Sequence, residues 1–199
     1  IKNCVAYGNG YLEDGTDAGN GNGFKMGGSS ITGYHTLINS VAFGNKAKGI
    51  DSNSCPDIQV KQSTSFNNES YNVAFYTNAG SKTDFGASGI LSYRTNKLEQ
   101  QEQLKLLQDE ATIRTATNYF WNETQKESVN SESMVVKASW FVSTENPKIT
   151  RNANGTINMN GFLELTAEAP EGIGARMTGT PSAVFTVTAD VVREDDNND

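Results

Sequence analysis

The sequence predicts an all-β protein: a solenoid of parallel strands, the parallel β-helix, with a C-terminal helix/loop/strand extension. A nine-residue segment recurs as IKNCVAYGN at 1–9, LINSVAFGN at 37–45 and VKQSTSFNN at 60–68, with a fading fourth copy, LSYRT, at 91–95. A second series, GFK at 23–25, GID at 49–51 and AFY at 74–76, alternates with these copies. Two short β-rich segments in each repeat fit a coil of strands, because residues 1–95 lack the long amphipathic stretches that helical repeats need.

Stacked coils place equivalent residues above one another, so the repeat predicts columns of like side chains. The first series aligns an aromatic column and an asparagine column: Tyr7, Phe43 and Phe66, and Asn9, Asn45 and Asn68. A buried asparagine needs its amide hydrogen-bonded, and a ladder of identical amides provides this at a turn. An ordinary β-sandwich with accidental similarity between its strands is the alternative.

Lys25 lies in the glycine-rich stretch GNGNGFKMGG at 19–28, directly after the long insertion GYLEDGTDAGNGNG. Glycine lets another molecule approach the main chain closely, so Lys25 is either a solvated loop charge or a reactive group presented to a ligand. Strand alternation puts Phe24 and Met26 on one side and Lys25 on the other. The second series then stacks Lys25, Asp51 and Tyr76 in one exposed row, which fits a polar binding groove and equally fits any solvated sheet face.

Several familiar motifs are absent. Lys25 follows Phe24 and precedes Met26, so the stretch is not a Walker phosphate loop, and its glycines miss the dinucleotide-binding spacing. The acidic loop at 13–23 misses the EF-hand spacing, which leaves open only a weak calcium site there. His35 is the only histidine, and no G-x-S-x-G element accompanies it, so we expect a structural histidine at the start of a strand.

The character of the chain changes after Thr95, which divides it into coils at 1–95 and an extension at 96–199 that caps the coil. Leucines in the Gln/Glu-rich segment 96–116 predict an amphipathic helix. Residues 133–143 and 183–192 are typical of strands, and the region between them is rich in turn residues. The acidic end REDDNND predicts a solvated, disordered tail.

Composition excludes some classes of partner. The 199 residues carry a net charge of −7 and no basic stripe, so a nucleic-acid partner is not expected. No apolar run is long enough to span a membrane. The chain begins with Ile1 and has no leader pattern, so we expect a longer protein upstream. Cys4 and Cys55 could form a disulfide, but their spacing matches no zinc or redox motif.

The residues GNGFKMGG, a following His, NSVAFGNKAKGIDSN and STSFNN…YNVAFY resemble the family 9 polysaccharide lyases, the pectate lyases of that group. The resemblance covers residues 1–95 and is looser afterwards. It implies a right-handed parallel β-helix, secretion, and Lys25 as the catalytic base that cleaves polygalacturonate. The resemblance also implies calcium held by an Asp-Asp-Gly-x-Asp cluster. That motif is absent from these residues, and Glu13, Asp14 and Asp17 do not match it, so the calcium ligands are expected upstream of this chain.

The implied reaction is β-elimination, in which a neutral base removes the proton next to a carboxylate and the glycosidic oxygen leaves. Calcium neutralises the carboxylate and stabilises the enolate-like intermediate. Lys25 is the candidate base, and Asn22, Asp51 and Tyr76 are the candidate substrate-binding residues. Two alternatives remain open: a non-catalytic β-helix that binds polysaccharide or serves as a surface or adhesion module, and an enzyme acting on a different uronic polymer.

Overall fold

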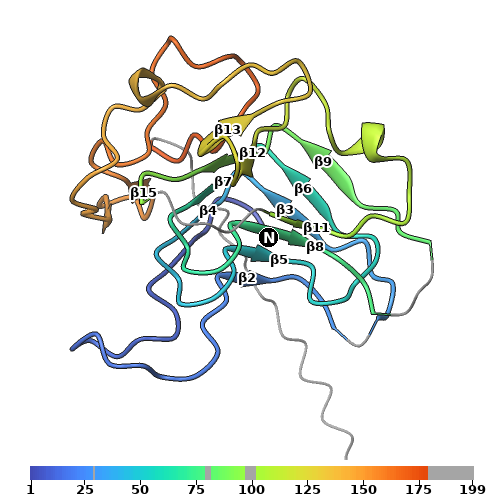
Figure 1. Cartoon of the computed structure of the whole chain (residues 1–199). Coiled ribbons are helices and arrows are strands. Elements are labelled where there is room, and N and C mark those ends of the chain that lie inside the picture. Colours follow the sequence, from blue (N-terminus) through green and yellow to red (C-terminus); the bar gives the residue numbers. More distant parts are fainter. Residues whose placement is uncertain (29, 79–81, 97–101, 179–199) are drawn as a thin grey trace, which may run out of the picture.

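The computed structural model describes residues 1–28, 30–78, 82–96 and 102–178, and it contains three sheets of parallel strands (Figure 1). The first sheet has the order β1 (Val5–Tyr7), β4 (Val41–Phe43), β7 (Thr64–Phe66) and β10 (Leu91–Tyr93). The second sheet has the order β2 (Phe24–Lys25), β5 (Ile50–Asp51), β8 (Val73–Phe75) and β11 (Gln103–Leu104). The third sheet contains β3 (Thr36–Ile38), β6 (Gln59–Lys61) and β9 (Gly86–Ser88). Each circuit of the chain adds one strand to each sheet in turn, which confirms the parallel β-helix.

The register of the first sheet is the one that the repeat predicts. Val5 pairs with Val41 and Val41 with Thr64, while Tyr7 pairs with Phe43 and Phe43 with Phe66. The rings of Tyr7 and Phe43 stack with centroids 4.9 Å apart, and the column continues into Tyr93. In the first three coils the next residue has a left-handed backbone and turns the chain; these residues are Gly8, Gly44 and Asn67, types that tolerate a positive φ.

The predicted asparagine column is confirmed, and it extends further than the repeat indicated. The amide nitrogen Nδ2 of Asn9 donates to Oδ1 of Asn45 at 2.7 Å, and that of Asn45 donates to Oδ1 of Asn68 at 2.7 Å. Asn68 then donates to Asn72 at 2.9 Å, and Asn72 donates to the Ser92 hydroxyl at 3.0 Å.

The far end of this ladder is a buried carboxylate. The Ser92 hydroxyl donates to Glu102, which also accepts the backbone N–H of Val73 at 2.8 Å. The guanidinium of Arg94 is buried nearby and donates to the carbonyl oxygens of Asn68 and Ser70. The amides of the ladder are therefore paired within the described coils, as buried amides require, whereas Nε of Arg94 is buried without a partner.

The alignment predicted for the second series is wrong for its third copy, AFY at 74–76. Ile50 pairs with Val73 and Asp51 with Ala74, so Tyr76 is not in the row of Lys25 and Asp51. Phe75 pairs with Leu104 instead. Val73 and Phe75 both point into the core, and a shift by two residues leaves every side chain on the same face. Apolar character alone could not distinguish these two registers.

Inward-facing residues of the three sheets fill the interior of the coil. This core includes Phe24, Leu37, Ile50, Val60, Val73 and Phe75, each at most 8% exposed. Cys55 is part of the core, and burial raises the pKa of its thiol to about 11. Cys4 and Cys55 are free thiols, so the disulfide left open above is not formed.

The helix predicted at 96–116 is wrong for the part that the structure describes. Residues 102–116 contain β11 and only a 3-10 turn, η1 (Glu110–Thr112). Leu104 and Leu106 pack against the core while Leu107 is 49% exposed, which is the alternation of a strand and not a helical stripe. The spacing of the leucines was a poor guide because this segment completes a further circuit of the coil.

The extension lies along the coil as well as over its end (Figure 1). Tyr119 continues the first sheet beside Leu91, just before the hairpin of β12 (Phe120–Asn122) and β13 (Glu127–Val129). A second hairpin joins β14 (Thr150–Arg151) to β15 (Ile157–Asn158). Phe162 packs edge-on against both Phe43 and Phe66, so the extension covers the outer face of the first sheet.

Two strand predictions for the extension have different outcomes. A continuous strand at 133–143 is wrong, because this segment forms isolated bridges and the 3-10 turn η2 (Ala138–Trp140). The strand predicted at 183–192 and the acidic tail lie outside the described residues. None of the helices in the described part of the chain has the length and apolarity of a membrane span.

Candidate active site

Lys25 ends β2 and points outward at the edge of the second sheet. Phe24 and Met26 on either side are 8% and 3% exposed, while Lys25 is exposed, as strand alternation predicts. The backbone around Lys25 is fixed on β5, since Phe24 N–H donates to the Gly49 carbonyl and Met26 N–H to the Asp51 carbonyl, both at 2.8 Å. The lysine therefore projects from a rigid part of the fold.

The glycines around Lys25 have a structural reason that sequence reasoning missed. A Cβ atom on Gly23 would lie 2.6 Å from the Gly49 carbonyl oxygen, and one on Gly27 would lie 2.3 Å from the Cβ of Cys55. Real side chains do not approach so closely, so these glycines admit the next coil. Their presence is explained without a ligand.

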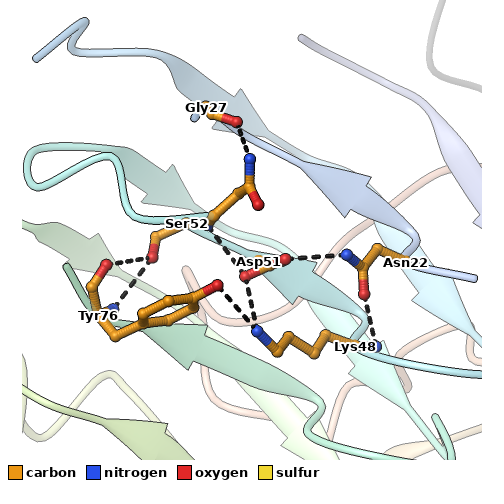
Figure 2. A network of polar contacts seen from close by, with 7 residues as sticks. Asn22, Gly27, Lys48, Asp51, Ser52 and Tyr76 are labelled. Carbon is orange, nitrogen blue, oxygen red and sulfur yellow. Dashed lines mark hydrogen bonds and ion pairs between the residues drawn. The ribbon is translucent and has the colours of Figure 1, made fainter. Parts of the chain in front are cut away.

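Asp51 follows Lys25 in the same outward row, but it is buried, at 1% exposure (Figure 2). Its Oδ2 accepts Nδ2 of Asn22 at 2.9 Å, and its Oδ1 accepts the backbone N–H of Asn53 at 3.0 Å. The same Oδ1 lies 3.3 Å from Nζ of Lys48. The expectation of an exposed carboxylate beside Lys25 is therefore corrected: three donors enclose this group.

Tyr76 joins the same network through Lys48, although it is two residues out of the predicted row (Figure 2). Nζ of Lys48 donates to the Tyr76 hydroxyl at 3.1 Å and lies 4.2 Å from the centre of its ring. The Tyr76 backbone is fixed in turn, because its N–H donates to Oγ of Ser52 at 3.0 Å. The structure thus brings Asn22, Asp51 and Tyr76 together around a residue that sequence reasoning did not select.

Lys25 also lines an open hollow of about 300 Å³, with Ile1, Met26, Gly27, His35 and Thr36. His35 directly precedes β3, where a structural histidine was expected, and its carbonyl oxygen accepts the N–H of Gln59 at 2.9 Å. Its ring is exposed at this end of the described coils.

The insertion before Lys25 forms a loop that is fixed to the later coils. Asp17 pairs with Lys46 at 2.9 Å, and a hydrogen bond to Glu69 raises the pKa of Tyr11 to about 12. At the base of the loop the Ala47 N–H donates to the Gly21 carbonyl at 2.9 Å. The loop therefore returns the chain to Asn22 in a defined place, beside the polar network.

Known proteins resemble the chain in both sequence and fold. A profile of the Pel9A-like, right handed beta helix region matches residues 1–85. Pectate lyase L of Paenibacillus polymyxa (strain SC2) is 35% identical over 92% of this chain and 37% of its own length. Pectate lyase L of Thermoclostridium stercorarium is 42% identical over 48% of this chain and 8% of its own length. The crystal structure of pectate lyase Pel9A superposes with a TM-score of 0.54 and 26% identity, over 85% of this chain and 38% of that one.

The chain is therefore similar to the Pel9A-like β-helix proteins, and the profile covers its residues 1–85. The chain spans less than two fifths of the length of each of these relatives, and the family profile covers the coils that carry Lys25 and the polar network. The right-handed parallel β-helix expected from the resemblance is thereby confirmed.

Carboxylates of this Pel9A-like chain do not assemble a calcium site around Lys25. Within the described ranges, no three His, Cys, Asp or Glu side chains come together as metal ligands. Asp51 is unsuited to the task because its oxygens already accept three donors. In the loop, Asp14 instead accepts the N–H and hydroxyl of Thr16. The described residues of this chain therefore do not fit the ion.

Lys48 is the residue of this Pel9A-like site that sequence reasoning missed, although a signal was available. Since Phe24 pairs with Ile50, Lys48 occupies in its coil the place that Asn22 has in the coil before. The backbone N–H of Lys48 donates to Oδ1 of Asn22 at 3.1 Å. A lysine that replaces an asparagine in a repeated position, three residues before a carboxylate, is the pattern that could have found it.

Proposed function

We propose that Lys25 is the general base of a pectate lyase-like β-elimination on polygalacturonate, and that this chain carries the proton-abstracting part of the enzyme. Its support is the outward position of Lys25 on a rigid strand, within the coils shared with proteins named pectate lyase. The amine would remove the proton at C5 of a galacturonate unit, a C4–C5 double bond would form, and the C4–oxygen bond would break.

Lys25 differs from two neighbouring lysines in its contacts. Lys46 and Lys48 pair with Asp17 and Asp51. No ion pair involves Lys25 among the residues that the structure describes. A general base needs a nitrogen that is open to the proton it removes. Of Lys25, Lys46 and Lys48, Lys25 is therefore best placed for the role.

Asn22, Asp51 and Tyr76 would bind substrate as one unit with Lys48, with Asp51 acting from below the surface. The calcium requirement and secretion implied by the resemblance belong to the same proposal. Calcium would neutralise the carboxylate next to the reacting carbon, and its ligands would come from outside these 199 residues.

The test is the ultraviolet absorbance of unsaturated product released from polygalacturonate by the intact protein that carries this chain. Lys25→Ala should abolish product formation while binding persists, because proton abstraction occurs only in the transition state. Lys25→Arg should be nearly as inactive, because guanidinium does not deprotonate at accessible pH. A calcium chelator should also stop the reaction.

The matched control is Lys61→Arg, an exposed lysine on β6 of the third sheet, which should leave the rate unchanged. Should Lys25→Arg keep most of the wild-type rate, Lys25 is only a positive charge in a groove. The non-catalytic polysaccharide-binding module then becomes the better description.

A further inference from the structure

We infer that Lys48 and the hydroxyl of Tyr76 form a recognition site for a substrate carboxylate, on a sugar next to the one that reacts at Lys25. This inference rests on the proposed function and adds a specificity-determining residue, Lys48, to it. Asp51 serves this site by positioning Lys48 and does not contact the substrate.

The hydrogen-bond inventory of Lys48 leaves a donor for a ligand. An ammonium group has three N–H donors and no acceptor. Nζ of Lys48 lies 3.3 Å from Oδ1 of Asp51 and donates to the Tyr76 hydroxyl at 3.1 Å, so one N–H remains. The Lys48 side chain is 19% exposed, so it is partly open to solvent.

The Tyr76 hydroxyl adds a second donor at the same place. Its oxygen accepts from Lys48 (Figure 2), so its own proton is not used in this hydrogen bond. Tyr76 is half-buried, with its backbone held by Ser52. Two donors presented side by side, one of them charged, match the two oxygens of a carboxylate.

Asp51 cannot compete with such a ligand for the open donors. The side chain is 1% exposed and also accepts Asn22 and the backbone of Asn53. Its charge holds Lys48 in place from the buried side, and the N–H of Lys48 and the hydroxyl of Tyr76 are the donors left for a ligand. An ion pair with a purely structural role would not need to keep a donor and a hydroxyl proton at the surface.

The position of the cluster relates it to Lys25. Asp51 pairs directly with Lys25 across the second sheet, and neighbouring strands lie about 4.8 Å apart. Lys48 and Tyr76 therefore lie within one or two coils of the proposed base, on the same face. A polysaccharide crossing the strands would place one sugar at Lys25 and the carboxylate of a neighbouring sugar at this cluster.

Steady-state kinetics of the intact protein test the inference. Lys48→Met should raise KM for polygalacturonate by about 10- to 100-fold and change kcat by less than about threefold, because a charge-assisted contact to a non-reacting sugar is lost. The loss should shrink on highly methyl-esterified pectin, whose esterified groups carry no charge. Lys61→Met is the matched control and should leave both constants unchanged.

Binding without turnover separates this inference from the proposed function. In a Lys25→Ala background, calorimetry with oligogalacturonate should show weaker binding when Lys48→Met is added, and Lys48→Arg should restore part of the affinity. Equal affinity of the Lys48→Met and parent proteins, at equal melting temperature, would overturn the inference whatever the role of Lys25. A folding defect is excluded by the Tyr76→Phe variant, which keeps the ring but should still weaken binding.

Discussion

Asn45 shows how a single amide serves several coils at once. Its Oδ1 accepts both the backbone N–H and Nδ2 of Asn9, at 3.2 and 2.7 Å, while its own Nδ2 donates to Asn68. The side chain is fully buried, so no water replaces a missing partner. Replacing Asn45 therefore lowers the free energy of unfolding partly through Asn9 and Asn68, which lose a hydrogen-bond partner.

Asn45→Leu should lower the free energy of unfolding by about 1–3 kcal/mol, because the neighbouring amides lose their partners in a buried place. Urea unfolding followed by fluorescence measures this. Asn9→Leu is the matched control, since Asn9 is exposed at the end of the described ladder, and it should cost clearly less. Equal costs for the two variants would show that burial within the ladder does not matter.

At the scale of elements, the extension and the first sheet are held together by interlocking rings. The ring centre of Phe162 lies 4.8 Å from that of Phe43 and 5.8 Å from that of Phe66, with interplanar angles of 64° and 80°. Phe141 stacks on Tyr93 at 5.0 Å. The aromatic column that the repeat predicted is thus a docking surface within the chain: the extension buries Phe43 and Phe66, while Tyr7 at its start is 54% exposed.

Phe162→Ala should destabilise the protein by about 3–5 kcal/mol and should make the extension the first segment cut by protease. Limited proteolysis with mass spectrometry identifies the cut sites. Val142→Ala, at a position 61% exposed, is the control and should be nearly silent. If cutting begins within the coils instead, the extension is held mainly by other contacts.

At the scale of the whole molecule, Glu102 couples the end of the ladder to pH. Burial raises the pKa of its carboxyl above the usual 4.5. A raised folded pKa means that the stabilising contribution of this group is fully present below the unfolded pKa and is lost as pH rises through the folded one. Arg94 opposes this loss without removing it, because burial is the larger effect.

Glu102→Gln should therefore be destabilised most below about pH 4.5, and its difference from wild type should shrink as pH rises above that value. The amide of Gln cannot titrate. Its NH₂ group would also face the Val73 N–H or the Ser92 hydroxyl, which donate to the Glu102 carboxyl in the wild type. Thermal melts across pH 4–8 measure the trend. Glu127→Gln, at an exposed carboxylate of β13, should follow the wild type throughout, and a constant difference for Glu102→Gln would contradict the coupling.

The coil could be predicted because aligning the repeats of the sequence gives the strand register of the first sheet. In each of the first three copies an aromatic residue such as Tyr7 or Phe43 precedes an asparagine such as Asn45 by two positions. Equivalent residues of successive copies are then paired in the sheet or hydrogen-bonded in the ladder. The second series was harder, since Val73 and Phe75 are both apolar and face the same way. The extension has no repeat, so only leucine spacing was available at 96–116, and packing against the coil decided its structure.

Some features of the candidate site could likewise be predicted from the sequence, and others could not. Lys25 was found by its setting, and its outward position followed from alternation. The burial of Asp51 and the central place of Lys48 depend on contacts between coils that no single segment contains. Glycines near Lys25 were read as room for a ligand, whereas Gly23 and Gly27 make room for the neighbouring coil.

The hydrogen bonds of the ladder all run in one direction, which gives the solenoid two different ends, as in a polar filament. Asn9 and Asn45 each donate to the asparagine of the next coil, Asn68 donates to Asn72 within its own coil, and Glu102, the last acceptor, has no amide N–H to donate. A duplicate of residues 37–59 inserted after the original would find an acceptor and a donor in place. A coil added beyond Glu102 would meet a carboxylate where it needs a donor, so lengthening by whole coils is tolerated only on the Asn9 side of that group.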